Sequence, residues 1–168
     1  MQADHIIGIY VRDLKALRRE LEAYPDEKDI WRLPPGIANS AGTLALHLAG
    51  SLRYLIGDVL GGSGYVRDRN AEFAKRDVPR AELVAGIDAA VAELQRARPR
   101  ITDAVLAAEF PVPLAGHRVK AGELLIHFAA HLGYHVGQVD YHRRIVTGRG
   151  DTVAAMAIPE LPTARKAE

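Results

Sequence analysis

Apolar residues recur at intervals of three and four along four separate stretches of the sequence, and this spacing constrains the fold more than any other feature. It places the apolar side chains on one face of an α-helix, and that face must pack against other helices to leave water. Four such helices pack most simply as a four-helix bundle, so the sequence predicts an all-α fold. The residues of the four faces are Ile7, Tyr10, Leu14, Leu17, Leu21 and Tyr24; Leu44, Leu48, Leu52, Leu55 and Val59; Val84, Ile87, Val91 and Leu94; and Leu125, Phe128, Leu132, Val136 and Val139.

Proline, glycine and short polar residues indicate where the second helix begins and ends. The sequence WRLPPGIANS, residues 31–40, predicts a loop because its Pro-Pro-Gly run breaks regular structure. Asn39 or Ser40, both residue types that cap helices, then precedes the helix. Gly61 and Gly62 follow its last apolar residue and predict its end.

A polar stretch precedes the third helix. Residues 63–76 lack a helical period and predict a loop. We expect Asp77 to cap the third helix and Pro79 to lie in its first turn, where the missing N–H does no harm. Beyond it, residues 102–107 favour one short helical turn. The prolines of residues 108–120 favour a loop or a small hairpin.

The fourth helix is the longest of the predicted elements. It runs from about Ala121 to Thr147, before the stop signal Gly148, and is therefore roughly 40 Å long. A chain of 168 residues is long enough to bury one core. We therefore expect one helical domain over residues 1–148, followed by an extended C-terminal tail over residues 149–168.

Composition excludes several classes of function. The formal net charge is +1, which gives no reason to expect nucleic acid or a membrane surface as a partner. The chain has no cysteine, so disulfides, a cysteine nucleophile and thiolate metal ligands are excluded. No apolar run reaches transmembrane length, and the N-terminus lacks the pattern of a secretion signal. We therefore expect a cytoplasmic protein.

Three histidines lie four residues apart in the fourth helix. They are His127, His131 and His135 in the sequence HFAAHLGYHVGQ. Residues four apart differ by about 40° in rotation and about 6 Å in height, so two such imidazoles reach one metal ion. Residues eight apart differ by about 12 Å in height, too far for one ion with bonds of about 2.1 Å. At most one adjacent pair therefore shares an ion, and another helix must supply the remaining ligand.

Helical rotation indicates which pair this is. His135 lies nearest the apolar face, His131 comes next and His127 lies further round as a flanking residue. His142 lies roughly 10 Å from His135 in height, too far to share its ion. The best candidate on another helix is His47, because it flanks the apolar face of the second helix.

Other roles for the histidines are also compatible with parts of the pattern. A histidine at the margin of a helix commonly just makes a hydrogen bond, and His5 and His117, at the ends of predicted elements, are less tied to a core. A di-iron bundle needs Glu-x-x-His on two helices, and the chain contains no such sequence. The His-Glu-x-x-His sequence of zinc proteases is also absent, so both of these enzyme classes are excluded.

Two stretches resemble motifs of the DinB/YfiT-like superfamily. HFAAHLGYHVGQVDYHRRI resembles its last helix, in which His-x-x-x-His is followed by Gly-Gln. PPGIANSAGTLALHLAGSLRYL is similar to its second helix, in which a Pro-Gly loop and a polar cap precede a His-Leu-Ala step and an Arg-Tyr-like pair. The order of elements and the length match over residues 1 to about 148. The matching residues are His131, His135, Gly137 and Gln138, and His47, Leu48, Ala49, Arg53 and Tyr54.

The resemblance implies an up-down-down-up four-helix bundle, often a homodimer, that holds a divalent metal ion. Its ligands would be His47, His131 and His135, the same three residues that helical geometry selects. We expect zinc or nickel, bound through neutral imidazoles. The family commonly has a tryptophan in the cap before the second helix, whereas Trp31 lies earlier in the loop.

Three histidine ligands leave one coordination position open, as in catalytic metal sites. Some members of the superfamily resemble metal-dependent thiol S-transferases, and others act as thiol-dependent isomerases. We therefore expect an enzyme, a transferase or a hydrolase, that activates a small-molecule thiol or water at the metal. A stress-related metal- or ligand-binding dimer without catalysis is the alternative. For Arg53 and Tyr54, both a substrate role and the ordinary roles of a solvated arginine and a packing aromatic stay open.

Overall fold

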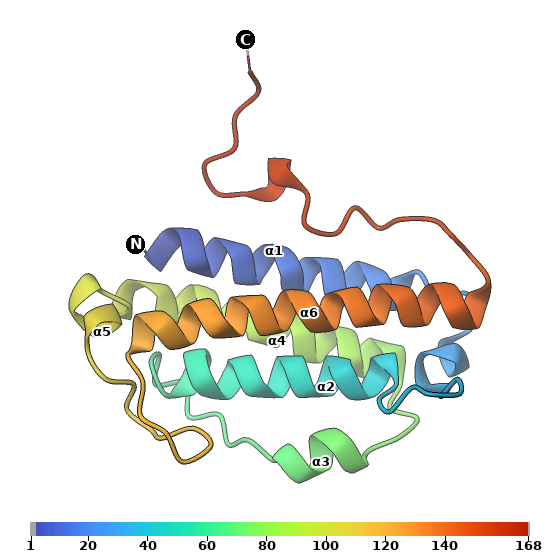
Figure 1. Ribbon diagram of the computed structural model, residues 1–168, viewed down its shortest axis with the longest axis horizontal. Helices are drawn as coiled ribbons and strands as arrows, with labels where there is room; N and C mark the ends of the chain where they lie inside the picture. The colour runs from blue at the N-terminus through green and yellow to red at the C-terminus, as the bar shows by residue number, and fades with distance from the viewer. Residues whose placement is uncertain (1–2, 168) are drawn as a thin grey trace.

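The computed structural model describes residues 3–167, and it confirms the predicted all-helical fold. None of the described residues forms an extended strand. No helix in this range combines the length and the apolar character needed to cross a membrane. The longer helices are α1 (Ala3–Glu22), α2 (Ala41–Leu52), α4 (Arg80–Ala97) and α6 (Ala121–Thr147), and the short ones are α3 (Arg69–Ala74) and α5 (Asp103–Ala107) (Figure 1).

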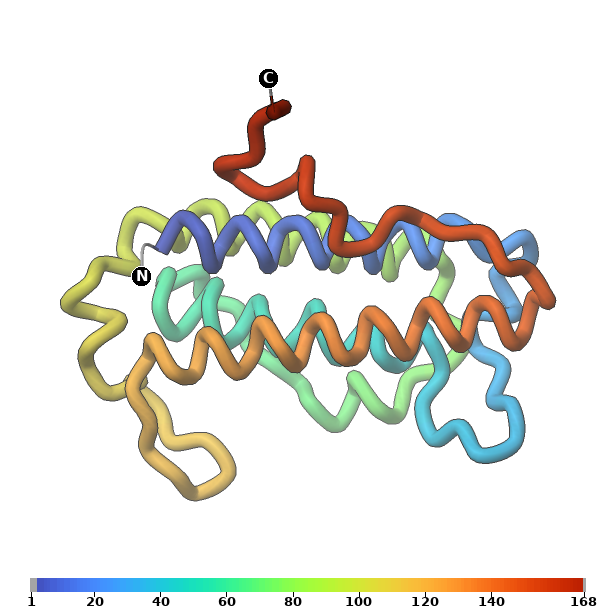
Figure 2. Tube along the Cα trace, turned by 45° about the horizontal axis from the view of Figure 1, so that its top comes forward, coloured from blue at the N-terminus to red at the C-terminus, as the bar shows by residue number. Residues whose placement is uncertain are grey.

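The four longer helices lie side by side. α1 packs against α4 and α6, and α2 packs against the same two helices. In Figures 1 and 2, residue numbers increase from left to right along α1 and α6, and from right to left along α2 and α4. α2 and α6 therefore run in opposite directions with their middle turns adjacent.

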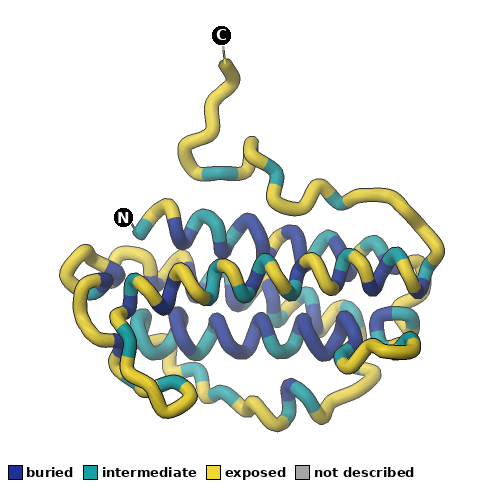
Figure 3. The backbone as a smooth tube through the Cα atoms, viewed as in Figure 1, coloured by how far each residue is buried: buried dark blue, intermediate teal, exposed yellow. Residues whose placement is uncertain are grey.

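The apolar faces expected from the sequence form most of the core, although Val59 and Phe128 are only half-buried and the face of α4 needs a correction. Every residue named for the face of α1 is at most 3% exposed, and the α2 face is buried from Leu44 to Leu55. On α4, however, Val84 and Val91 are only half-buried. The buried apolar positions of this helix are instead Leu83, Ile87, Ala90, Leu94 and Ala97. The two alanines lie on the face of α4 that contacts α1 and α2. The buried face is therefore rotated away from the predicted valines. Figure 3 shows that α2 is buried along most of its length.

The predicted cap begins α2, and the predicted glycines end the helical path that continues beyond α2. The Ser40 hydroxyl accepts a hydrogen bond from the backbone N–H of Thr43 at 3.2 Å, so Ser40 is the cap. After Leu52 the chain continues through one π-helical turn, Arg53–Asp58. It leaves the helical path at Gly61 and Gly62.

The prediction of a loop over residues 63–76 is wrong for α3. The Asp68 side chain accepts a hydrogen bond from the backbone N–H of Ala71 at 2.9 Å and caps this helix. A helix of six residues is too short to show a period, and its sequence RNAEFA contains one large apolar residue, Phe73. Its stability depends on contacts with α2, which the sequence pattern does not reveal.

The predicted start of α4 is also wrong. Asp77 has a φ of 55° and does not cap the helix. Pro79 is not in the first turn: it stands immediately before Arg80 with a ψ of 142°, outside the helix. A proline fits this position because the capping residue has a non-helical conformation and needs no N–H.

The elements before and after α6 agree with the sequence. α5 confirms the predicted short helical turn. The segment after it closes as a small hairpin, in which Leu114 and His117 exchange two backbone hydrogen bonds of 2.9 Å. α6 begins and ends at the predicted residues, and Gly148 after it adopts the left-handed φ of 67° that stops a helix.

Residues 149–167 lead from α6 across α1 (Figures 1 and 3). The Arg19 guanidinium of α1 donates a hydrogen bond to the Val153 carbonyl at 3.0 Å. Arg143 of α6 pairs with Glu20 at 2.6 Å and donates to the Asp151 carbonyl at 2.7 Å, and both members of this ion pair are fully buried. These contacts attach the beginning of the tail to the helices.

Candidate metal centre

Two of the predicted histidines face each other one turn apart on α6. The neighbouring residues Leu132 and Val136 are buried in the core and fix the rotation of this helix. The Nε2 atoms of His131 and His135 lie 3.1 Å apart. Their ring centroids are 4.4 Å apart and their planes are nearly perpendicular, at 87°. The four-residue spacing therefore brings both Nε2 atoms to one point between the rings.

His47 reaches the same point from α2. Its ring centroid lies 5.4 Å from that of His131 and 5.7 Å from that of His135. One ligand nitrogen from each of the three rings lies within 4.8 Å of the other two, and all three side chains are half-buried. Among residues 3–167, no other set of histidine and carboxylate side chains has this arrangement.

α3 supplies a carboxylate that orients His47. The Glu72 Oε2 atom lies 3.1 Å from His47 Nδ1, and Arg67 donates two hydrogen bonds of 2.7 Å to the same carboxylate. Arg67 also approaches His47 Nδ1, but at the longer distance of 3.4 Å. The shorter contact to a carboxylate oxygen favours the tautomer with its proton on Nδ1. This tautomer leaves the lone pair of His47 Nε2 free for a metal ion.

Glu72 can reach His47 because α2 has a glycine where α3 docks. A Cβ atom at Gly50 would lie 2.3 Å from Glu72 Oε1 and 2.9 Å from the carboxyl carbon, too close for both to stay in place. The adjacent Phe73 packs its ring 5.0 Å from that of His47, measured between centroids. α3 therefore contacts His47 with both a carboxylate and an aromatic ring.

Gln138 orients His135 in a similar way. Its Oε1 atom lies 2.6 Å from His135 Nδ1 and accepts a hydrogen bond from it. The proton of His135 is thus held on Nδ1, and its Nε2 lone pair faces His131. Gln138 is the glutamine of the Gly-Gln pair in the sequence motif, which gives that residue a defined task.

Burial keeps the α6 histidines of the cluster neutral. Burial, followed by repulsion from His135 and His47, lowers the pKa of His131 to about 4. The pKa of His135 is lowered as well, again mainly by burial. Burial raises the pKa of Glu72, but the hydrogen bonds from Arg67 and His47 outweigh this effect, so its pKa lies below the usual value. At neutral pH the site therefore combines an ionised carboxylate with neutral α6 imidazoles, the form of histidine that binds metals.

The remaining histidines lie outside the cluster. His127 is exposed, and its ring centroid is 6.4 Å from that of His131. His142 is buried with both nitrogens in use: Nδ1 lies 2.7 Å from the Tyr24 hydroxyl, and Nε2 lies 2.8 Å from the Arg32 carbonyl. The two others, one on α1 and one in the hairpin, are both exposed: His5 and His117.

The Arg-Tyr pair after His47 makes contacts away from the cluster. Arg53 donates two hydrogen bonds to Glu93 on α4, at 3.0 and 2.8 Å, and its guanidinium lies 4.0 Å from the centre of the Tyr65 ring. Tyr54 is half-buried and packs against the core. Arg53 is therefore a paired residue rather than a solvated one, and Tyr54 is a packing aromatic.

Glu72 and Arg67 were not predicted as residues of the site, because both lie in the stretch interpreted as a loop. One signal was present: Asp68 is a favourable capping residue, and the residues after it are compatible with a helix. No local pattern, however, connects position 72 with position 47. That contact depends on how α3 docks against α2.

The donor set of the cluster fits a divalent transition metal ion. Imidazole nitrogens suit zinc, nickel, copper and iron, whereas calcium and magnesium prefer oxygen ligands. Two of the three rings are held at Nδ1 by outside partners, the arrangement that commonly orients metal-binding histidines. Three protein ligands leave room for a small molecule in a tetrahedral site.

Comparison with known protein families agrees with these features. The sequence matches the DinB superfamily over residues 9–139, more than three quarters of the chain and a range that contains all three clustered histidines. No curated protein matches the sequence at a significant level. Because the family match covers most of the chain, the protein belongs to the DinB superfamily.

Proposed function

We propose that the protein is a metal-dependent enzyme that activates a small-molecule thiol, or water, at a divalent ion held by His47, His131 and His135. Zinc and nickel are the ions that we expect there. The observation that carries the proposal is the convergence of one nitrogen from each ring within 4.8 Å, a group that contains no fourth ligand from the described part of the chain. This leaves a coordination position for a substrate.

Each side chain of the site has a defined task in this proposal. Glu72 and Gln138 keep the protons of His47 and His135 on Nδ1, so that the Nε2 lone pairs remain available. A divalent ion bound there acts as a Lewis acid that lowers the pKa of a thiol or water at its remaining position. Because the chain contains no cysteine, the sulfur must come from a cosubstrate, as in a thiol S-transferase.

We also propose that the four longer helices form the up-down-down-up bundle implied by the family resemblance. The shared direction of α1 and α6, opposite to that of α2 and α4, supports this topology. A homodimer is proposed on the same resemblance. Light scattering should give twice the 18.3 kDa chain mass at micromolar concentration, and a monomer would contradict this part of the proposal.

Metal loading followed by a thiol titration tests the proposed function. The full chain is stripped with a chelator and reloaded with cobalt, which reports sulfur ligands through a charge-transfer absorption in the near ultraviolet. Adding 2-mercaptoethanol should produce this absorption, and ethylene glycol, its oxygen analogue, should not. His135→Ala should show no absorption with either compound.

The possible results bear on different parts of the proposal. A protein that retains no metal after loading would overturn the proposed site. A protein that retains metal but gives no thiol signal would exclude thiol activation and leave activation of water or the non-catalytic metal- or ligand-binding dimer.

A further inference from the structure

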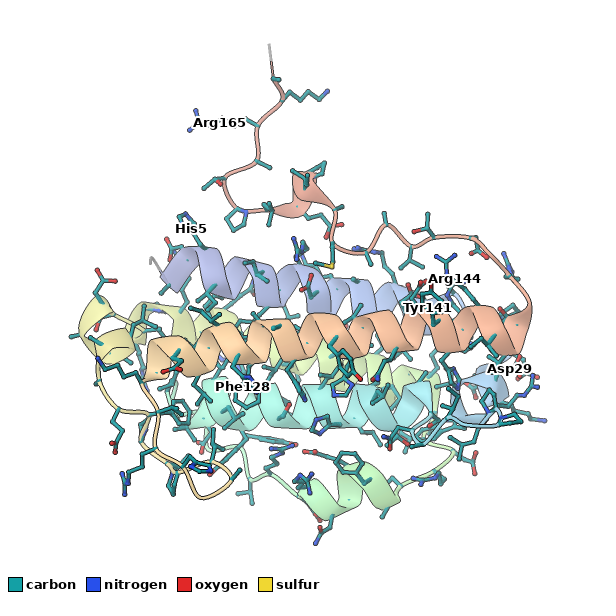
Figure 4. The ribbon with its side chains drawn as sticks, in the orientation of Figure 1. His5, Asp29, Phe128, Tyr141, Arg144 and Arg165 are labelled. Atoms are coloured by element: carbon teal, nitrogen blue, oxygen red, sulfur yellow. The ribbon has the colours of Figure 1, made fainter. Side chains whose placement is uncertain are left out.

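A half-enclosed groove of about 300 Å³ begins beside the histidine cluster. Residues 36–39, which precede α2, form one side of it, and the last turns of α6 form the other. Tyr141 and Ile145 on α6 are 69% and 56% exposed, and Tyr141 is labelled on the visible side of α6 in Figure 4. Exposed apolar side chains that line a concave surface are typical of ligand-binding sites.

The lining of the groove contains no charged side chain. His142 lines part of it, and burial lowers the pKa of this imidazole and favours its neutral form. The other polar groups are the amides of Asn39 and Gln138 and the hydroxyl of Tyr141. The apolar part consists mainly of Ile37, Leu44 and Ile145. Such a surface suits an uncharged ligand, since an ion would lose its hydration without gaining a partner.

A wider depression of the protein has the opposite character. It measures about 740 Å³ and is wide open, and its lining includes Glu22, Asp26, Glu27 and Arg80. It lies on α1, α4 and the segment between α1 and α2, whereas the histidine cluster lies on α2 and α6. Its position and its charges therefore separate it from the proposed centre.

Gln138 connects the groove with the histidine cluster. Its side chain lines the groove, and its Oε1 atom lies 2.6 Å from His135 Nδ1. The groove continues along α6 from Gln138 to Ile145, a distance of roughly 10 Å at 1.5 Å per residue. A molecule of that length would have one end beside the Nδ1 edge of His135 and its body between α6 and residues 36–39.

We propose that this groove binds the body of the substrate, a small uncharged apolar molecule whose reactive end extends past Gln138 and the His135 ring toward the histidine cluster. The identification of this ligand as the substrate rests on the proposed function. The preference of the groove for an uncharged apolar molecule does not depend on the metal. The groove thus assigns the substrate that it holds to a neutral apolar class.

The test uses the full chain labelled with nitrogen-15 and two probes of the same shape. 1-Naphthol is neutral at pH 7, and 1-naphthoate carries a negative charge. Titration with 1-naphthol should shift the amide signals of residues 36–39 and 138–145, whereas 1-naphthoate should bind much more weakly. Each titration is run on the metal-free and on the zinc-loaded protein.

A pair of matched variants locates the binding. Ile145→Asp places a charge in the groove, and because this side chain is 56% exposed the substitution leaves the core intact. Ile126→Asp changes an equally exposed isoleucine of α6, at 55%, outside the groove. The dissociation constant for 1-naphthol should rise about tenfold or more in Ile145→Asp and stay unchanged in Ile126→Asp.

Three results would overturn the inference: shifts confined to other surfaces, equal effects of the two aspartates, or equal binding of both probes. A loss of dimer in Ile145→Asp alone, seen by light scattering, would also overturn it, because a second copy would then cover the groove. If the protein takes up zinc but does not bind 1-naphthol, the inference about the groove is refuted and the proposed function is not. Probe binding in a protein that takes up no metal leaves the apolar groove in place and refutes the proposed function instead.

Discussion

Glu72→Gln tests whether the α3 carboxylate supports metal binding. In the folded protein this carboxylate receives two hydrogen bonds of 2.7 Å from Arg67 and lies 3.1 Å from His47 Nδ1. The amide of glutamine keeps one acceptor oxygen, so it cannot serve both Arg67 and His47 as the carboxylate does. Changing the outer partner of a metal-binding histidine typically lowers metal affinity by about 10- to 100-fold. We therefore expect zinc binding to weaken by about 1.4–2.7 kcal/mol.

Competition with a chromophoric chelator measures this loss, and Glu93→Gln serves as the matched control. Glu93 is also a buried carboxylate, 7% exposed, and it pairs with Arg53 at 2.8 Å away from the cluster. Both substitutions leave an arginine without its carboxylate, so both should lower the free energy of unfolding. Only Glu72→Gln should change the zinc affinity. An unchanged affinity in Glu72→Gln, or equal losses in both variants, would refute the role assigned to α3.

Three further predictions follow from the same geometry. His135→Ala should remove stoichiometric metal, whereas His127→Ala should leave most of it bound, as measured by metal analysis after desalting; equal losses would contradict the ligand assignment. Gly50→Ala should weaken zinc binding in the chelator competition, because its Cβ would displace the α3 carboxylate, while Gly133→Ala on α6, with open space around it, should not. In the metal-free protein, folded His131 has a pKa of about 4 and the unfolded chain titrates near 6.5, so stability should fall as the pH drops through this window. His131→Gln should reduce this dependence by about 1–2 kcal/mol, allowing for partial exposure, and urea unfolding curves that keep the same pH dependence would count against it.

The parts of the site that follow from local sequence were predictable. On a regular helix the spacing of His131 and His135 fixes their separation, whatever the rest of the chain does. Gly148 and Ser40 likewise act within one or two turns of their own position, and the structure has both as predicted. The apolar faces were predictable for the same reason, because burial follows helical periodicity when most of the face consists of large residues.

The predictions that were wrong concern contacts between distant segments of the chain, or helix faces that contain small residues. α3 is short, and it is held by Glu72 against Gly50, a contact that a periodic pattern cannot reveal. On α4, Ala90 and Ala97 are buried, but alanine carries little weight in an apolar pattern, so the predicted face was rotated. Asp77 was predicted as the cap of α4, with Pro79 in the first turn, but the observed start after Pro79 depends on the backbone conformation before the helix.

The hydrogen bond between the two α6 histidines determines which proton must move when a metal binds. His135 donates its Nδ1 proton to Gln138, so its Nε2 is an acceptor in the neutral ring. His131 Nε2, 3.1 Å away, must therefore be the donor and carries the proton in the metal-free protein. That nitrogen cannot bind an ion until its proton moves to Nδ1 or is lost. Nitrogen-15 shifts of the His131 ring should accordingly report a proton on Nε2 before zinc is added and on Nδ1 afterwards, while those of His135 should keep theirs on Nδ1 throughout. A His131 ring already protonated on Nδ1 in the metal-free protein would show that the two rings are arranged differently in solution.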